Sequence, residues 1–221
     1  MAAKSQSSGS ELLGDRRSAS KGERQRRAIL DSLQGLLRYR SIAELTVGEI
    51  ASSAKVTRSG FYFYFDTKFA PLAVLLSEAY DDWTSSQSGI LLRFANETPA
   101  EYCRRCISSA AQTWKTHENI FVATFQAMPM DRTITDEWNK WNTRTESILE
   151  EQVRRDFDHS VAERHYQDMR SLLKTLARMT QYELYKSRID NYSDAEQERM
   201  INALCHIWLA SLWGLDSAAG V

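Results

Sequence analysis

The chain has 221 residues, a net charge of −1 and 43% hydrophobic residues. Only nine glycines and three prolines interrupt it, and residues that favour helices are plentiful, so an all-α protein is predicted. No apolar run reaches the ~18 residues that span a bilayer, and the N-terminus lacks the apolar segment of a signal peptide. Three cysteines, an odd number, argue against a disulfide framework. We therefore expect a cytoplasmic protein without a membrane partner.

The charges are distributed unevenly along the chain. Residues 16–75 contain eleven basic and five acidic residues, a net charge of +6. Residues 76–221 contain sixteen basic and twenty-two acidic residues, a net charge of −6, and the first fifteen residues contribute −1. Because residues 16–75 are basic and the rest of the chain is acidic, we expect the basic segment to face a phosphate-bearing partner.

The first 20 residues are rich in Ser, Ala, Gly and Lys and are predicted to form a disordered, basic arm. This arm either touches a nucleic-acid backbone or minor groove, or is a solvated tail. Its basic run continues into the first predicted helix and comprises Arg16, Arg17, Lys21, Arg24, Arg26 and Arg27. That helix is predicted over residues 21–39, and its buried side chains are Ile29, Leu33, Leu36 and Leu37.

Residues 46–68 have the pattern of two short helices joined by a tight turn. Thr46 and Glu49 form a capping box, and Val47, Ile50 and Ala51 recur at helical spacing. The turn is predicted at residues 54–56. Thr57 can cap the second helix, whose aromatic core is predicted to come from Phe61, Phe63 and Phe65.

Such a helix-turn-helix suits major-groove reading of DNA, in which the second helix presents its N-terminal residues to the bases. The predicted base contacts are Thr57, Arg58, Ser59 and Gly60. The predicted phosphate contacts are Thr46, Tyr62, Tyr64 and Lys68. The alternative is an ordinary helical hairpin with a polar face.

This segment resembles the DNA-binding domain of the TetR family of bacterial repressors, over residues 24–76. The matching residues are Leu45-Thr46-Val47, Ile50-Ala51, Val56-Thr57-Arg58, Gly60-Phe61-Tyr62, Tyr64-Phe65 and Lys68. Ser53 and Pro71 depart from the family pattern without breaking it. The FYFYF run, together with His206-Ile207-Trp208, is most similar to the EthR-like members. The resemblance implies a head over residues 21–66 and a ligand-binding and dimerisation domain over residues 67–221.

The second domain is expected to be entirely helical. A fourth helix, residues 67–86, links it to the head, and further helices are predicted over residues 99–116, 118–127, 132–158, 160–189 and 194–214. The segment after residue 98 contains five of the six tryptophans. For any single aromatic residue, an ordinary place in the core is the alternative to a place in a ligand pocket.

In EthR-like proteins the second domain encloses a long apolar tunnel, which implies a small hydrophobic effector here. The resemblance nominates as its lining Tyr102, Cys103, Trp114, Trp138, Asn142, Thr145, Ile148, Leu149, Thr180, Leu184 and Trp208. Thr180, Asn142 and Glu183 are the candidate polar anchors.

The same resemblance implies a homodimer, formed by a four-helix bundle from the last two helices of each subunit. An apolar stripe in the last predicted helix agrees with this, and comprises Met200, Leu204, Ile207, Ser211 and Leu212, with Ala203 and Ala210 beside it. The expected partners are therefore an operator in double-stranded DNA, the effector and a second copy of the chain.

Other functions have weaker signals. Cys103 and Cys106 have the C-x-x-C spacing, but only Cys205 and His206 could supply further zinc ligands. No catalytic or phosphate-cradling motif is present, so no enzyme activity, metal or cofactor is expected. Three alternatives to a ligand-released repressor stay open: a helical carrier, an enzyme that uses the apolar pocket, and a regulator that responds to thiol oxidation or metal.

Overall fold

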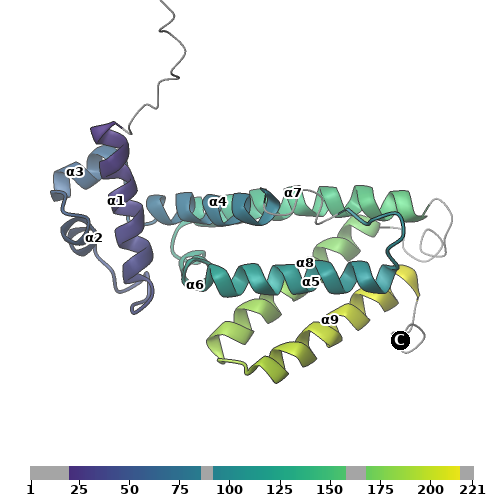
Figure 1. The fold of residues 1–221 in the computed structure, drawn as a ribbon. Coiled ribbons are helices and arrows are strands. Elements are labelled where there is room, and N and C mark those ends of the chain that lie inside the picture. The colour runs from purple at the N-terminus through teal and green to yellow at the C-terminus, as the bar shows by residue number, and fades with distance from the viewer. Residues whose placement is uncertain (1–19, 86–91, 158–167, 215–221) are drawn as a thin grey trace, which may run out of the picture.

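The computed structural model describes residues 20–85, 92–157 and 168–214, and within these ranges the regular structure is helical without a β-strand (Figure 1). The all-α prediction is confirmed. Three helices form what we call the head: α1 (Lys21–Leu36), α2 (Val47–Ser53) and α3 (Arg58–Tyr64). Six form the body: α4 (Ala70–Ser85), α5 (Pro99–Thr116), α6 (Glu118–Ala127), α7 (Arg132–Phe157), α8 (Met169–Ile189) and α9 (Asp194–Trp213). The predicted arm, apart from Ser20, lies outside the described residues.

Local capping explains where many of these helices begin. Capping boxes start α1, α2, α5 and α9, each pairing a Ser or Thr hydroxyl with a glutamate three residues later. Hydrogen bonds from the capping residue lower the pKa of Glu23, Glu101 and Glu196, since they favour the charged form. For Glu49 a hydrogen bond from Arg40 is the largest cause, followed by those from Thr46. Gly214 ends α9 with a φ of 61°, a left-handed conformation that glycine adopts without strain.

Most predicted boundaries agree with the structure, and the differences have local causes. The first helix ends at Leu36 rather than Tyr39, because the backbone N–H groups of Arg38 and Tyr39 bond to carbonyls only three residues earlier. The fourth helix begins at Ala70 rather than Thr67. Thr67 instead accepts hydrogen bonds from the backbone of Phe69 and Ala70, both at 3.2 Å. For the predicted 160–189 helix, the described part starts at Met169 after the N-cap Asp168, and residues 158–167 lie outside the described residues.

One buried cluster of apolar side chains extends from the head into the body. Helix α4 connects the two parts, since it packs against α1 in the head and against α6 and α7 in the body. Figure 1 shows α1 running across the direction of α4. Arg27 of α1 also binds Glu78 of α4, with 2.7 Å between nitrogen and oxygen. Helix α4 is therefore joined to the head both by packing and by an ion pair.

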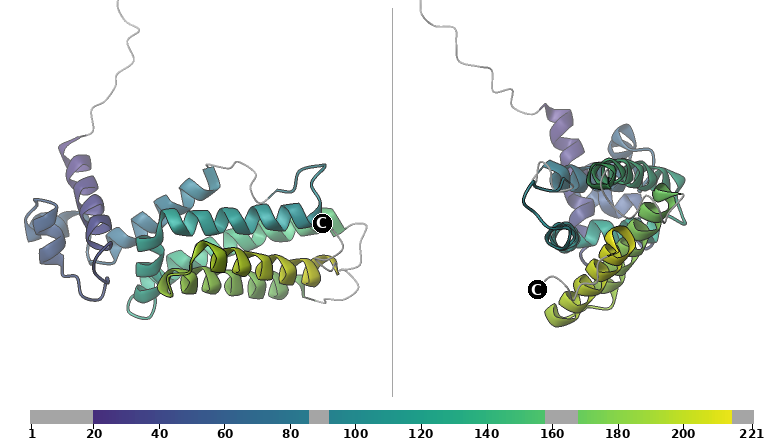
Figure 2. Two further views of the ribbon diagram at one scale, coloured as in Figure 1. Left: turned by 60° about the horizontal axis from the view of Figure 1, so that its bottom comes forward. Right: turned by 90° about the vertical axis from the view of Figure 1, so that its right-hand side faces the viewer.

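Helices α8 and α9 form an antiparallel pair along one side of the body (Figure 2). Helix α9 packs on α5 and α8 packs on α7, so each helix has one inner face. The outer face of the pair carries Tyr182 and Ile207, both substantially exposed. None of the described helices combines the length and apolar character that a bilayer crossing requires.

Candidate functional site

The second motif helix begins as the sequence predicts. Thr57 is the N-cap of α3, and its Oγ1 accepts a hydrogen bond of 2.9 Å from the backbone of Gly60. The hydroxyls of Thr57 and Ser59 lie 3.0 Å apart. A Cβ at position 60 would lie 3.1 Å from Thr57 Oγ1, so glycine allows the cap to close tightly over the first turn. Four of the predicted DNA contacts thus form one compact helix start.

The exposed side of α3 combines a cation with aromatic rings. Arg58 and Tyr62 are both exposed, and the Arg58 guanidinium lies over the Tyr62 ring at 5.9 Å from its centroid. Phe63 was predicted to share the aromatic core, and this was wrong. Phe61 and Phe65 are buried, whereas Phe63 is 81% exposed. The helical period explains the difference, because residues four apart share a face and residues two apart do not.

Tyr64 connects the recognition helix to the first helix. Its side chain is half-buried, and its hydroxyl donates a hydrogen bond of 3.0 Å to Gln25 Oε1 on α1. This contact spans 39 residues and joins α3 directly to α1. The sequence assigned Tyr64 only to phosphate binding and missed this partner.

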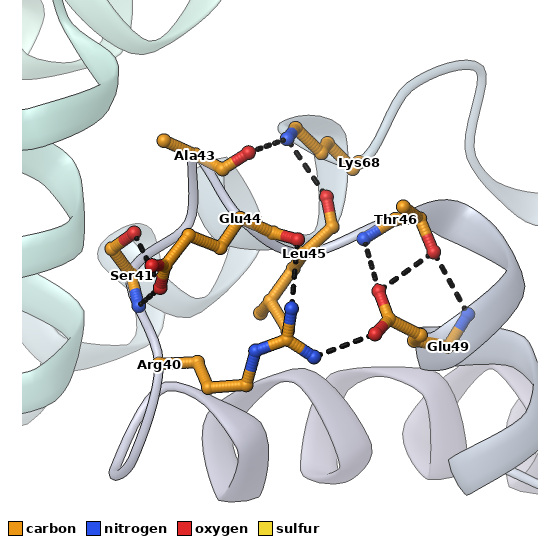
Figure 3. Close-up of polar contacts among 8 residues, drawn as sticks. All are labelled: Arg40, Ser41, Ala43, Glu44, Leu45, Thr46, Glu49 and Lys68. Carbon is orange, nitrogen blue, oxygen red and sulfur yellow. Dashed lines mark hydrogen bonds and ion pairs between the residues drawn. The ribbon is translucent and has the colours of Figure 1, made fainter.

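Lys68 and Thr46 lie within a polar network around the loop between α1 and α2 (Figure 3). The Lys68 ammonium donates hydrogen bonds to the carbonyl oxygens of Ala43 at 3.0 Å and Leu45 at 2.8 Å. Thr46 Oγ1 donates to Glu49 at 2.7 Å and accepts from the Glu49 backbone at 3.3 Å. Both side chains therefore have structural partners besides the phosphates predicted for them.

Arg40 completes this network from the end of the loop nearest α1. It binds Glu49 Oε1 at 2.6 Å and donates to the carbonyl oxygen of Glu44 at 2.9 Å. Hydrogen bonds from Arg40 and Thr46 lower the pKa of Glu49 to about 2. The Glu49 carboxylate is thus charged at neutral pH, and Arg40 neutralises it close to Thr46.

The body contains two adjoining cavities, of about 30 Å³ and 80 Å³. The smaller is lined by Tyr80, Trp83, Ala110, Thr113, Trp114, Phe121, Trp138, Trp141, Asn142, Thr145 and Gln181. The larger is lined by Trp83, Tyr102, Cys103, Cys106, Ile107, Ala110, Thr145, Leu149, Ala177, Thr180, Gln181 and Trp208. Four residues belong to both walls, so the cavities follow one path through the body. No wall residue carries a charge at neutral pH.

Nine of the eleven nominated ligand residues line these cavities. The exceptions are Ile148, which is half-buried, and Leu184, which is packed into the core. Glu183 does not line either cavity and instead borders a groove on the outer face of α8 and α9. Gln181, two residues before Glu183 on α8, lines both cavities. Residues two apart point to nearly opposite sides of a helix, so Glu183 faces away from them.

Several polar groups on the cavity walls bind one another. Thr180 Oγ1 accepts a hydrogen bond of 2.9 Å from Trp208 Nε1 and donates one of 2.9 Å to the carbonyl oxygen of Leu176. Gln181 Oε1 accepts from Trp114 Nε1 at 3.0 Å. Within the part of the chain that the structure describes, the Asn142 side chain makes no hydrogen bond. Asn142 thus presents an uncommitted amide to the smaller cavity.

Helix α4 contributes wall residues that the sequence prediction missed. Tyr80 and Trp83 both line the smaller cavity. The Tyr80 hydroxyl lies 3.2 Å from Thr145 Oγ1 on α7, and its ring centroid lies 3.9 Å from that of Trp141. Tyr80 lies on the fourth predicted helix, but no sequence pattern indicates that α7 lies opposite it.

The three cysteines are free thiols, and burial raises the pKa of each. The pKa of Cys106 rises to about 12 and that of Cys205 to about 11. The thiolate is the form that reacts with oxidants and binds metals, so these values disfavour both reactions. Among the described residues, no group of three or more His, Cys, Asp or Glu side chains could hold a metal ion. The thiol- or metal-responsive alternative thus has no support in this part of the chain.

Comparisons with known proteins address the head and the body separately. Residues 29–70 match the family described as bacterial regulatory proteins, tetR family. Residues 103–214, about half of the chain, match the family described as transcriptional regulator EthR, C-terminal domain. The two matches correspond to the head with the start of α4, and to the body from α5 to the end of α9.

Full-length relatives give the same assignment. The chain is 26% identical over 216 residues to the HTH-type transcriptional regulator EthR of Mycobacterium tuberculosis, covering 91% of this chain and 93% of the relative. It is 24% identical to EthR of Mycolicibacterium smegmatis, covering 91% and 92%. A tetR-family regulator structure from Streptomyces coelicolor has the same fold, with a TM-score of 0.62, 18% identity and coverage of 86% and 80%. The chain therefore belongs to the TetR family of bacterial transcriptional regulators, as an EthR-like member.

Proposed function

We propose that the protein is a repressor that binds a pseudo-palindromic operator as a homodimer and is released by a small, mainly apolar ligand. One observation carries the proposal: α4 contacts the head and also forms part of the cavity wall. Its Glu78 binds Arg27 of the head, and its Tyr80 and Trp83 line the cavity. A ligand that moves α4 would therefore move the head.

The proposed DNA contacts are those expected from the sequence. Thr57, Arg58, Ser59 and Gly60 face the bases, and Thr46, Tyr62, Tyr64 and Lys68 hold phosphates. The exposure of Arg58, Ser59 and Tyr62 on α3 supports this assignment. Arg26 of α1 is also exposed, with its guanidinium over the Phe65 ring at 5.3 Å, and adds a positive charge close to α3.

The proposed dimer forms through the outer face of α8 and α9. A groove on this face is lined by Met179, Glu183, Tyr192, Glu196, Arg199, Met200, Ala203, Leu204 and Ile207. Of the predicted apolar stripe, Met200, Leu204 and Leu212 are buried within the subunit, so Ile207 is its exposed apolar member. Exposed Ala203 and Ala210 beside it would let a partner helix approach closely. A symmetric pair would present two α3 helices to equivalent half-sites.

The proposed ligand is uncharged and elongated. The cavity walls carry no charge at neutral pH, so a carboxylate or ammonium group would be buried there without a partner, at high cost. Asn142 is a better polar anchor than Thr180, whose hydroxyl already accepts from Trp208 and donates to Leu176. Trp114, Trp138 and Trp208 would report binding through their fluorescence.

The cavity volumes support a release mechanism. Pockets that hold drug-sized ligands usually measure roughly 300–1,000 Å³. The described cavities are far smaller, so the ligand must separate helices in order to enter. A ligand shifts an equilibrium only if it binds one arrangement more tightly, and here it favours the wider body. Displacement of α4 in both subunits would then change the distance between the two α3 helices, which would no longer match the half-sites of the operator.

The test combines a ligand screen with DNA binding. Apolar, uncharged compounds would be screened by thermal shift, and the hits added to the protein bound to a duplex selected from a random pool. We expect hits to release the duplex, and we expect Asn142→Leu to weaken this effect for hits that carry a hydrogen-bonding group. Compounds that stabilise the protein without releasing DNA would refute the release mechanism. Ligand binding without any sequence-dependent DNA binding would instead indicate a carrier or an enzyme.

A further inference from the structure

An exposed phenylalanine lies in the middle of the recognition helix. Phe63 is 81% exposed, although phenylalanine is among the residues most often buried. Its neighbours Phe61 and Phe65 fill the core of the head, so Phe63 contributes little to folding. Single exposed apolar residues are common on protein surfaces, so the position of Phe63 on the recognition helix, next to exposed Tyr62, is what makes it a candidate contact.

The surroundings of Phe63 are polar and basic. Ser59 lies one turn earlier on the same face of α3 and is also exposed. Tyr62 lies beside them and carries the Arg58 guanidinium over its ring. Phe63 is therefore an apolar group within the surface proposed to contact DNA. The segment that includes the head, residues 16–75, has a net charge of +6.

Among the described residues, the Phe63 ring has one aromatic contact, with its neighbour in the chain. It packs edge to face against the Tyr64 ring, with 5.0 Å between centroids and 86° between planes. Tyr64 is itself fixed by its hydrogen bond to Gln25 of α1. This contact favours one orientation of the apolar group, and any restriction of the free ring reduces the entropy lost on binding.

We propose that Phe63 contacts the methyl group of a thymine in the major groove and so selects thymine at one position of each half-site. This inference rests on the proposed placement of α3 in the major groove. The thymine C5 methyl is the apolar group on the base edges of that groove, and phenylalanine is one of the side chains that contact it. Phosphates offer no such partner, so the contact adds sequence selection to the polar contacts around it.

Deoxyuridine tests this contact, because it lacks only the methyl group and pairs as thymine does. The probe is a duplex selected from a random pool by the full-length protein, with each thymine replaced in turn. We expect one thymine in each half-site to be sensitive, and its replacement to weaken binding about four-fold, the effect of one buried methyl. With Phe63→Ala, binding to the unmodified duplex weakens and the deoxyuridine effect disappears. We expect Phe63→Leu to retain part of the deoxyuridine effect, because leucine is also apolar.

Two controls separate this contact from a general effect. Tyr39→Ala removes another exposed aromatic ring, 86% accessible, from the turn after α1. It lies at the end of α1 opposite to Gln25, where α3 is attached, so the deoxyuridine effect should persist. Thermal unfolding of Phe63→Ala should match the wild type, because its ring buries little surface.

Three results would overturn the inference. The first is equal deoxyuridine sensitivity in Phe63→Ala and wild type, and the second is a selected duplex with no sensitive thymine. The third is a Phe63→Ala variant that binds every duplex normally but loses self-association, which would make Phe63 a protein contact. If the pool yields no enriched sequence at all, the proposed function fails and this inference fails with it.

Discussion

Lys68 and Leu45 are joined by a hydrogen bond of 2.8 Å between the lysine ammonium and the leucine carbonyl oxygen. A second bond, of 3.0 Å, joins the same ammonium to Ala43. Lys68 thus ties the start of α4 to the loop that precedes α2 (Figure 3). The ammonium has three protons, so one remains for the proposed phosphate contact.

Lys68→Ala should therefore have two separable effects. Loss of the phosphate contact should weaken binding to all sequences alike and lower the salt slope by about one unit. Loss of the carbonyl contacts should reduce the free energy of unfolding by about 1–3 kcal/mol. Fluorescence anisotropy at several salt concentrations and urea unfolding would measure them. Lys115→Ala, an exposed lysine of the body, is the control.

The two outcomes distinguish the roles of Lys68. An unchanged salt slope with reduced stability would show that Lys68 only supports the loop. A change in the preferred base sequence would contradict the assignment of Lys68 to a phosphate.

Glu49→Gln should destabilise the protein in a pH-dependent way. The folded-state pKa of Glu49 is about 2, below its ordinary value of 4.5, so its ionised form stabilises the fold. This contribution is complete above about pH 4.5 and is lost as the pH falls towards 2. Urea midpoints of variant and wild type should differ at pH 6 and converge with acid. A difference that stays constant down to pH 3 would refute the assignment. Glu146→Gln, at a residue without a polar contact in the described chain, is the control.

Tyr80→Phe should impair ligand response more than DNA binding. It removes the contact between the Tyr80 hydroxyl and Thr145, which joins α4 to α7 across the cavity. We expect the ligand concentration for half-release of DNA to change, with DNA affinity in the absence of ligand kept within about two-fold. Thr145→Val removes the same contact from the other side, so the double variant should show no further effect. Additive effects would mean that the two hydroxyls act separately.

Ile207→Arg should break the proposed dimer. A charge on the outer face of α9 would have to be buried between two subunits, which is strongly unfavourable. Analytical ultracentrifugation should show a monomer, and operator binding should weaken at least ten-fold while the helical content is retained. Met130→Arg places the same charge at another exposed apolar residue, in the α6–α7 connection, and should have no effect. A dimeric Ile207→Arg protein with wild-type operator binding would refute this interface.

Most helices could be predicted from the sequence, because caps and helical periodicity depend on residues a few positions apart. Thr57 caps α3 through Gly60, three residues away, and the boundaries of α5 and α6 agree with the predicted spans. The family resemblance also nominated nine residues of the cavity walls, about half of the lining. The helical period would also have predicted that Phe63 is exposed, because Phe61 and Phe65 lie on one face of α3 and Phe63 lies on the opposite one.

Contacts between residues far apart in the chain could not be predicted from the sequence. Arg27 binds Glu78, Tyr64 binds Gln25, and Lys68 binds the loop before α2, at separations from 23 to 51 residues. Nothing in the sequence favoured either Thr180 or Asn142 as a polar anchor. In the fold, Trp208 donates a hydrogen bond to the Thr180 hydroxyl, so the two residues differ. Periodicity fixes which face of a helix a residue occupies, but which helix packs on that face depends on how all the helices share one core.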